Sequence, residues 1–212
     1  MSSEPLPGWV RGSMWFGLVA VTLYIAGWAI AGQVRDGYDP SEQAISELFE
    51  IGAPWVSRWW LVAGLALSGV AFLLLAPALD RALPGEGRLG PALVVLAGVG
   101  TLGVLAAPCT SSCPGFGTTT TDSWHVINAG LGYSALASAP LAFAWRLRQH
   151  TPRLARWSAI IGGVSVLLFL VHVTGLVPVA PGLQQRVFNT IADAWYVLIV
   201  VAVLRRDRCW LR

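Results

Sequence analysis

The chain has 212 residues, of which 55% are apolar and only 12% are charged. Soluble domains carry about 25% charged residues, so this composition excludes an ordinary soluble protein and predicts an integral membrane protein. The net charge of +3 does not indicate nucleic-acid binding, because the arginines stand at the ends of apolar runs and not among exposed aromatic residues.

Six apolar runs are long enough to cross a membrane as helices. A hydrocarbon core about 30 Å thick needs about 20 helical residues. Continuous runs favour helices over the alternating strands of a barrel, because a helix satisfies its own backbone amides within lipid. We therefore expect an all-α bundle of six transmembrane helices, with residues 1–212 in a single transmembrane domain. The predicted spans are Ser13–Gly32, Ser57–Leu79, Leu89–Ala107, Trp124–Trp145, Trp157–Val177 and Val187–Leu204.

The arginines predict the orientation of this bundle, because basic residues near the ends of spans stay on the cytoplasmic side. By this rule eleven of the 14 arginines share one side, and only Arg35, Arg58 and Arg186 lie on the other. We expect a multi-pass protein of the cell membrane with both termini in the cytoplasm. The loops expected to face outward are residues 33–56, 108–123 and 178–186.

The first outward loop contains the most polar stretch of the chain, Tyr38–Pro54. Asp39 is suited to cap a short helix there, and Glu42 follows it at the spacing of a capping box. Such a helix would be amphipathic. Its apolar face would hold Ala44, Ile45, Leu48 and Phe49, and its polar face Gln43, Ser46, Glu47 and Glu50. Two placements are open: an interfacial helix on the lipid boundary, or a lid over the mouth of the bundle with Ser46 or Glu47 pointing inward.

The second outward loop contains two cysteines four residues apart, Cys109 and Cys113. Disulfides persist outside the cytoplasm, so the loop's predicted location favours a bond between them. Two free thiols in a tight turn are the alternative. A cysteine-based metal site is disfavoured because no second pair of cysteines accompanies this one.

Polar residues within the spans gather toward the outward side. His125 opens the fourth span, with Asp122 and Asn128 on the same helical face, and His172 lies near the outer end of the fifth. The sixth span begins with a polar face formed by Arg186, Asn189 and Asp193. An ionisable residue in a bilayer costs roughly 2.5–3.5 kcal/mol, so such residues are usually paired or functional. Arg186 or a histidine is the expected partner of Asp193.

These residues form the candidate site, and several chemistries remain open for it. The candidate catalytic residues are Glu47, His125, His172 and Asp193, and the candidate substrate-binding residues are Ser46, Arg186 and Asn189. Both histidines with Asp193 have the ligand types of a hydrolytic zinc site, although no HExxH pair is present. Ser46 with a histidine and a carboxylate would suit an acyl-transfer triad. Haem between the two histidines is the weakest alternative, and a non-catalytic pocket needs only a cavity with a polar rim.

Several short motifs along the chain resemble a known family. They are Ser46-Glu47-Leu48, the sequence Gly-Ala-Pro at 52–54, His125 at the start of the fourth span, and Gly-Leu-x-Gln-Arg-Val at 182–187. With six spans, this pattern resembles the domain-of-unknown-function 998 family of prokaryotic membrane proteins over nearly the whole chain. The resemblance implies the fold but no activity. A more remote likeness in layout to multi-span proteins of lipid-anchor remodelling favours lipid chemistry by analogy alone.

Two functions of different class follow as hypotheses. The first is a membrane-embedded enzyme, a hydrolase or transferase, that acts on a lipid or lipid-linked substrate at the outer leaflet. Arg186 would then bind an anionic headgroup through charge-assisted hydrogen bonds. The second is a non-catalytic lipid-binding or accessory protein whose polar cluster holds the helices together. A transporter is less favoured, since no broken span marks an alternating-access site.

Overall fold

The computed structural model describes residues 6–205, and every regular element in that range is helical. Each of the six long helices is long and apolar enough to cross a membrane. The predicted all-α bundle of six transmembrane helices is therefore confirmed for these residues; residues 1–5 and 206–212 of the predicted single domain lie outside the described range. The elements are α1 (Gly8–Val34), the 3-10 helix η1 (Ile45–Phe49), α2 (Trp55–Ala82), α3 (Leu89–Ala106), α4 (Thr120–Leu147), α5 (Pro152–Thr174) and α6 (Pro181–Arg205).

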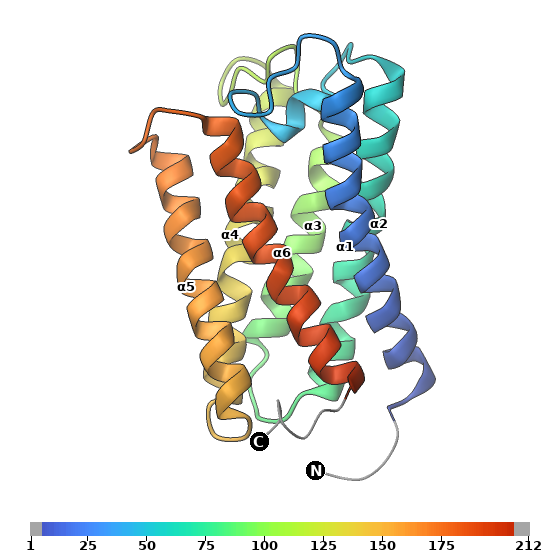
Figure 1. Ribbon diagram of the computed structural model, residues 1–212, viewed down its shortest axis with the longest axis vertical. Coiled ribbons are helices and arrows are strands. Elements are labelled where there is room, and N and C mark those ends of the chain that lie inside the picture. The colour runs from blue at the N-terminus through green and yellow to red at the C-terminus, as the bar shows by residue number, and fades with distance from the viewer. Residues whose placement is uncertain (1–5, 206–212) are drawn as a thin grey trace.

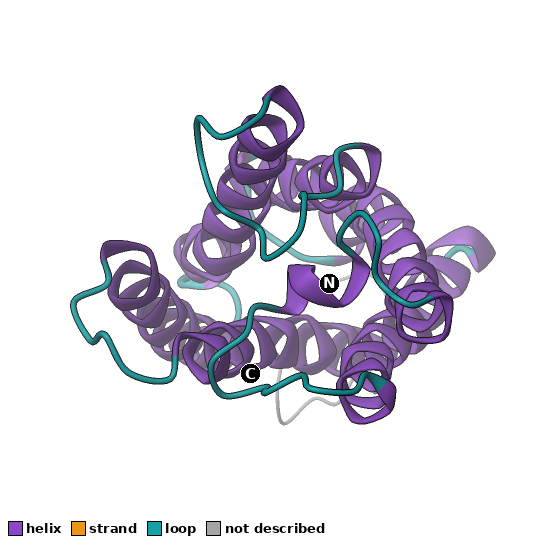
Figure 2. Ribbon diagram, turned by 90° about the horizontal axis from the view of Figure 1, so that it is seen from above, coloured by secondary structure: helices purple, strands orange, loops and turns teal. Residues whose placement is uncertain are grey.

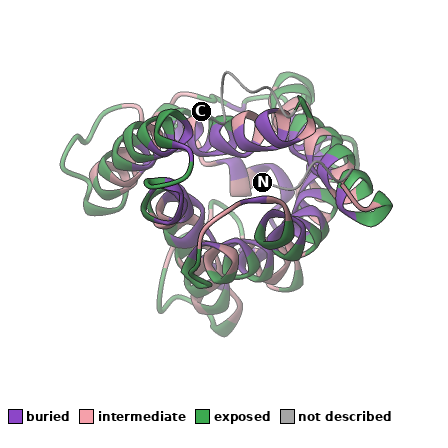
Figure 3. Ribbon diagram, turned by 90° about the horizontal axis from the view of Figure 1, so that it is seen from below, coloured by how far each residue is buried: buried purple, intermediate pink, exposed green. Residues whose placement is uncertain are grey.

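The helices stand side by side in a ring. Helices that follow one another in sequence pack together, and α6 closes the ring by contacting α1. Seen from above, η1 lies across the middle of the ring (Figure 2). Buried residues face the inside of the ring and exposed ones face outward (Figure 3). Many of the exposed residues are large and apolar, as expected of helices whose outer faces contact lipid.

The two ends of the bundle are built differently (Figure 1). One end, which we call the lid end, carries η1 and the loops that follow α1, α3 and α5. The opposite end carries the start of α1, the end of α6 and the two remaining loops. Both described chain ends are thus on one side, as an even number of spans requires. The arginine distribution predicts that the lid end faces outward.

Glycines allow α3 and α4 to approach closely. A Cβ placed on Gly100 would lie 2.4 Å from the backbone nitrogen of Gly132, and one on Gly103 would overlap the side chain of Asn128. Small residues at such positions let helix backbones pack directly in a membrane, where the apolar solvent provides no hydrophobic drive for association. This contact fixes the wall that α3 and α4 give to the interior of the bundle.

Several helices extend beyond the predicted spans. Helix α4 begins at Thr120 because the Thr119 hydroxyl accepts a hydrogen bond from the Asp122 backbone N–H at 3.0 Å, which caps the helix. Helix α5 begins five residues before the predicted span but ends at Thr174, three residues short of the predicted Val177, because Gly175 has a φ of +62° and the left-handed conformation of a helix stop. Helix α6 begins at Pro181, so most of the loop predicted at 178–186 is its first turn and a half.

The helix expected to start at Asp39 is not formed. One Asp39 carboxylate oxygen instead accepts from the backbone N–H and the hydroxyl of Ser41, at 2.8 and 2.6 Å, which makes a local turn. The carbonyl of Gln43 accepts from the side chains of Tyr38 and Arg186, so it does not serve a continuing helix. Only the five-residue η1 follows, and its capping glutamate is Glu47, five residues after the predicted Glu42.

The apolar side of η1 packs into the bundle and not onto the lipid boundary. Ile45, Leu48 and Phe49 are buried in a cluster with Tyr24 and Leu61 of the first two spans. Of the two placements considered for this segment, the structure therefore has the lid over the mouth of the bundle. We call Tyr38–Pro54 the lid.

The opposite end is held by one arginine. Arg146 of α4 forms an ion pair with Asp80 at 2.5 Å and donates to the carbonyl oxygens of Asp80 and Leu83 at 2.9 Å each. These carbonyls belong to the last turn of α2 and the residue after it, whose oxygens lack helical partners. Arg146 therefore caps the end of α2.

Candidate functional site

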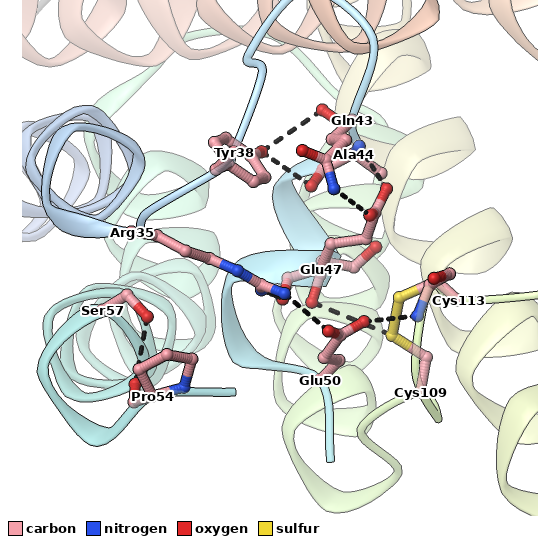
Figure 4. A network of polar contacts seen from close by, with 12 residues as sticks. Arg35, Tyr38, Gln43, Ala44, Glu47, Glu50, Pro54, Ser57, Cys109 and Cys113 are labelled. Carbon is pink, nitrogen blue, oxygen red and sulfur yellow. Dashed lines mark hydrogen bonds and ion pairs between the residues drawn. A yellow bond between two sulfur atoms is a disulfide. The ribbon is translucent and has the colours of Figure 1, made fainter. Parts of the chain in front are cut away.

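Arg35 and Glu50 attach the lid to its neighbours on two sides (Figure 4). The Arg35 guanidinium lies 2.7 Å from the Glu50 carboxylate and also donates to the carbonyl of Glu47. The second Glu50 oxygen accepts from the backbone N–H of Ser112 at 2.6 Å. Because Glu50 is buried, this network has a low-dielectric surrounding in which its hydrogen bonds are strengthened. The end of α1, the lid and the loop before α4 are thereby joined.

The predicted disulfide is present in that same loop. Cys109 and Cys113 are bonded, with their Cα atoms 5.0 Å apart. The Cys109 carbonyl accepts from the backbone N–H of Ile51 at 2.8 Å, which places the lid against the disulfide. The Asp122 carboxylate accepts from the backbone N–H and hydroxyl of Thr110 at 2.7 and 2.9 Å and so anchors the loop to α4.

Arg186 fastens the lid to α6. Its Nη1 donates to the carbonyl oxygens of Pro40 and Gln43, at 2.8 Å each, and to that of Gly182 at 2.9 Å. Its Nη2 donates to the hydroxyl of Tyr38. Gly182 makes this close contact possible, since a Cβ there would lie 2.3 Å from the Gln43 oxygen. Arg186 is only 5% exposed, so its charge is directed to the lid.

Glu47 also serves the lid. One carboxylate oxygen accepts from the backbone N–H of Ala44 and the other from the Gln43 amide, at 2.8 Å each. Ile45, the residue after Ala44, donates its backbone N–H to the side-chain oxygen of Gln185 of α6 at 2.7 Å. The side-chain amide of Gln185 donates in turn to the Tyr133 hydroxyl of α4 at 3.0 Å. Glu47 therefore shapes the turn, while Gln185 carries the polar contact from the lid into the bundle.

Beneath the lid lies a cavity of about 260 Å³, which we call the chamber. Every span contributes to its wall, and the lid forms its cover. The wall is mostly apolar and aromatic, with a few polar side chains, which is the usual character of a ligand pocket. The residues around the chamber are Tyr24, Ala44, Ile45, Ser46, Phe49, Leu65, Val104, Cys113, His125, Val126, Ala129, Gly130, Tyr133, Phe169, His172, Val173 and Gln185.

The chamber reaches the outer surface of the bundle between α4 and α5. Val126 and Gly130 of α4 and Val173 of α5 line the chamber and are exposed. A Cβ placed on Gly130 would meet no atom within 4 Å. This gap, which we call the portal, lies between two helices near the lid end, on a side of the bundle where lipid is expected. It is suited to lateral entry of a membrane-dissolved molecule.

The two histidines lie in the chamber wall but in different surroundings. The Nδ1 atom of His125 donates to the carbonyl oxygen of Ala107 at 2.8 Å, which ties the ring to the end of α3. The ring of His172 packs on Phe188 with centroids 5.7 Å apart, and its Nδ1 has no hydrogen-bond partner in residues 6–205. Of the two histidines, His172 is therefore the one whose Nδ1 is not held by the protein among the described residues.

A second, smaller cavity of about 50 Å³ lies next to the chamber, deeper in the bundle. We call it the inner cavity. Asp193 and Asn189 of α6 line it, and the Asn189 amide donates to the Tyr24 hydroxyl at 2.6 Å. The two cavities share part of their walls, with Tyr24 and Tyr133 among the shared residues. The inner cavity therefore adjoins the chamber, and it contains the carboxyl group of Asp193.

Comparison with known proteins identifies the family. The family model described as "Protein of unknown function (DUF998)" matches residues 18–202, which is most of the chain. The chain belongs to the DUF998 family. No curated protein and no solved structure matches it. The resemblance inferred from the short motifs is therefore confirmed, and the functional reading of this DUF998 protein has to come from its geometry.

The structure separates the predicted site residues of the DUF998 protein into three places. Ser46, His125 and His172 line the chamber, and Asn189 and Asp193 line the inner cavity. Glu47 and Arg186 line neither cavity, since both are engaged by the lid. The expected pairing of Asp193 with Arg186 is not made among the described residues, because the lid carbonyls take the guanidinium.

The zinc hypothesis gains no geometric support. Within residues 6–205 no group of three or more His, Cys, Asp or Glu side chains is close enough to hold a metal ion. Asp193 lines the inner cavity whereas His125 and His172 line the chamber. A tetrahedral zinc site needs its ligands within about 2.3 Å of one point. We therefore derive no metal chemistry for these residues.

Sequence reasoning missed Tyr24, Tyr133 and Gln185. The two tyrosines stand where the cavities meet, and Gln185 joins Tyr133 to the lid. They carry no charge, so a search for ionisable residues in the spans passes over them. A usable signal exists: a tyrosine far from a span end is away from the headgroup depth that aromatic residues favour, and its hydroxyl then needs a partner inside the bundle.

Proposed function

We propose that this DUF998 protein binds a membrane lipid or lipid-linked amphiphile, which enters the chamber from the outer leaflet through the portal. The observation that supports this most is the position of the portal between α4 and α5, bordered by exposed Val126, Gly130 and Val173. The apolar chamber wall suits an acyl chain, and the inner cavity offers polar groups to a headgroup. The arginine distribution supports an outward-facing lid end, and with it the outer leaflet as the source.

The proposal is tested by closing the portal. Gly130→Trp adds a large side chain where a Cβ meets open space, so it fills the portal without disturbing helix packing. Gly163→Trp on α5 is the matched control, because Gly163 is also exposed with no atom within 4 Å of its Cβ position and lines neither cavity.

Native mass spectrometry of protein extracted in a mild detergent measures the bound lipid. We expect Gly130→Trp to reduce lipid occupancy at least about tenfold, which corresponds to a loss of about 1.4 kcal/mol of binding free energy. Gly163→Trp should retain the occupancy of the unmodified protein. Equal occupancy in all three proteins would show that the portal is not the route of entry.

Catalysis on the bound amphiphile is a second candidate function, supported by His172. Its Nδ1 has no partner among the described residues, although the ring lies in the chamber wall. An unengaged imidazole beside a substrate is suited to general acid–base work. Ser46 lines the same chamber and is the candidate nucleophile. The protein would then be a hydrolase or transferase of the lipid that it binds.

A further inference from the structure

Asp193 is a buried carboxylate without a partner. It is 2% exposed, and its Oδ2 has no hydrogen-bond partner among the described residues. Helix α6 begins at Pro181, so Asp193 lies about 18 Å from the lid end at about 1.5 Å per residue. That depth is close to the middle of a hydrocarbon core about 30 Å thick. An unpaired acidic group at that depth is costly in free energy, so it indicates a functional site.

No basic side chain in the wall of the inner cavity balances Asp193. Arg186, two turns earlier on α6, is engaged by the lid carbonyls and by Tyr38. Neither cavity wall contains an arginine, and the chain has no lysine. His125 and His172 line the chamber and are absent from the inner cavity. The inner cavity therefore contains an acidic group and, among the described residues, no basic side chain.

This charge pattern disfavours an anionic headgroup. A phosphate moved toward the inner cavity would approach the Asp193 carboxylate and find no guanidinium or ammonium to bind it. Like charges in a low-dielectric surrounding repel strongly. The sequence-based assignment of Arg186 to an anionic headgroup also has no support in the geometry, since Arg186 lines neither cavity.

The neutral groups around Asp193 suit a donor of hydrogen bonds. Hydroxyl and amide oxygens of neutral side chains line the inner cavity, and they can accept from an N–H group. A cavity needs about 10–15 Å³ by the same measure to hold one water molecule, so about 50 Å³ accommodates a small ammonium group. The polar lining residues other than Asp193 are Tyr24, Ser68, Thr101, Asn128, Tyr133 and Asn189.

We propose that the amphiphile bound in the chamber carries an amine, whose ammonium group enters the inner cavity and pairs with the Asp193 carboxylate. The hydrocarbon part occupies the chamber and extends through the portal beside Gly130. This inference rests on the proposed lipid-binding function and adds the chemical class of the headgroup. A charged amine gains a counter-ion at a depth where both charges alone would be costly.

The experiment compares three probes with the same chain length: dodecylamine, the neutral N-acetyldodecylamine and 1-dodecanol. The thermal unfolding midpoint is measured for the full chain in neutral detergent. A ligand at a concentration of about 100 times its Kd stabilises the folded protein enough to raise the unfolding midpoint by about 5 °C. We expect this shift with dodecylamine and a shift no more than half as large with either neutral probe.

Asp193→Asn tests whether the carboxylate causes the amine preference. The variant keeps the size of the side chain and removes a buried charge, so we expect it to fold and to respond equally to dodecylamine and dodecanol. Asp36→Asn is the control, because Asp36 is an exposed carboxylate in the loop after α1 and lines neither cavity. It should keep the full preference for the amine.

The outcomes separate this inference from the function on which it rests. Equal shifts with all three probes in the unmodified protein, or an amine preference that survives in Asp193→Asn, would overturn the amine assignment and leave lipid binding intact. No shift with any probe would overturn both. A stabilisation by sodium chloride over choline chloride that is lost in Asp193→Asn would assign the site to a small inorganic cation and would also refute the amine.

Discussion

The guanidinium of Arg186 donates to the hydroxyl of Tyr38 and to the carbonyl of Gln43 in the same loop. These contacts join the first turn of α6 to the segment that covers the bundle, across more than 140 residues of sequence. The lid is thereby part of the α6 structure, and α6 also carries the Asp193 carboxylate of the inner cavity. Arg186 therefore stabilises the cover of the chamber and lines neither cavity.

Replacement of Arg186 by alanine should therefore destabilise the lid strongly. The change removes the donor to the Pro40 carbonyl and to the buried Tyr38 hydroxyl, and it leaves the Gln43 carbonyl with one donor fewer. A buried polar group left without its partner costs about 1–3 kcal/mol. We expect a clear fall in the thermal unfolding midpoint in detergent. Arg58→Ala at the same end is the control and should change it little, and an equal loss in both variants would argue against the clamp.

Reduction of the Cys109–Cys113 disulfide should loosen the lid as well. A closed loop of five residues is worth about 2 kcal/mol by the chain-entropy relation. The Cys109 carbonyl also accepts a hydrogen bond from the Ile51 backbone N–H. A more mobile loop therefore weakens a contact that holds the lid in place. We expect dithiothreitol to lower the unfolding midpoint of the unmodified protein.

The matched variant for this test replaces both cysteines by serine. It should begin at the lower midpoint and show no further change with reductant. If reductant lowers the midpoint of the double variant equally, the effect does not come from this disulfide.

The six spans could be predicted because a run of about 20 apolar residues is a local property of the sequence. The lid could not be predicted in detail. The capping box expected at Asp39 competes with a turn in which the same carboxylate bonds Ser41, and the sequence alone does not rank the two. The arginine that decides the outcome lies far along the chain and binds backbone carbonyls, which have no signature in side-chain identity.

The candidate site was predicted in part for a similar reason. Spacing placed Asn189 and Asp193 on one face of α6, and both line the inner cavity. The same spacing placed Arg186 with them, yet its long side chain turns toward the lid, where unpaired carbonyl oxygens are concentrated. Helical periodicity predicts the face of a helix; it does not predict which partner a flexible side chain finds at the end of that face.

The stability of the lid should depend on pH through Tyr38. Burial raises the pKa of the Tyr38 hydroxyl above its ordinary value, and this outweighs the opposite influence of the Arg186 guanidinium. Because the folded-state pKa is the higher one, the stabilisation is fully present below the unfolded value of about 10 and is lost as the pH rises through the folded-state value. We expect the unfolding midpoint to fall above about pH 10.

The variant that isolates this effect is Tyr38→Phe. It loses the hydroxyl that donates to the Ala44 carbonyl at 2.8 Å, so its midpoint should be lower at neutral pH. Above about pH 10 it should fall less steeply than the unmodified protein, because the other tyrosines are common to both. Identical slopes would show that Tyr38 does not control the alkaline transition.

His172 provides the test that separates catalysis from binding. His172→Phe keeps a ring that can pack on Phe188, as the imidazole does at 5.7 Å, but removes the unpartnered Nδ1. If His172 is the acid–base group, turnover of the bound lipid should fall about 10²–10⁴-fold, while lipid occupancy stays the same. His150→Ala, an exposed histidine at the opposite end, is the control.

Turnover is measured by mass spectrometry of the lipids in proteoliposomes that contain each variant and the lipid identified by native mass spectrometry. A product formed by the unmodified protein and by His150→Ala, but not by His172→Phe, would support an enzyme with His172 in the chamber as its acid–base group. Product formation at the same rate in all three would remove His172 from that role. If the unmodified protein binds its lipid and leaves it unchanged, the portal, chamber and inner cavity serve binding alone.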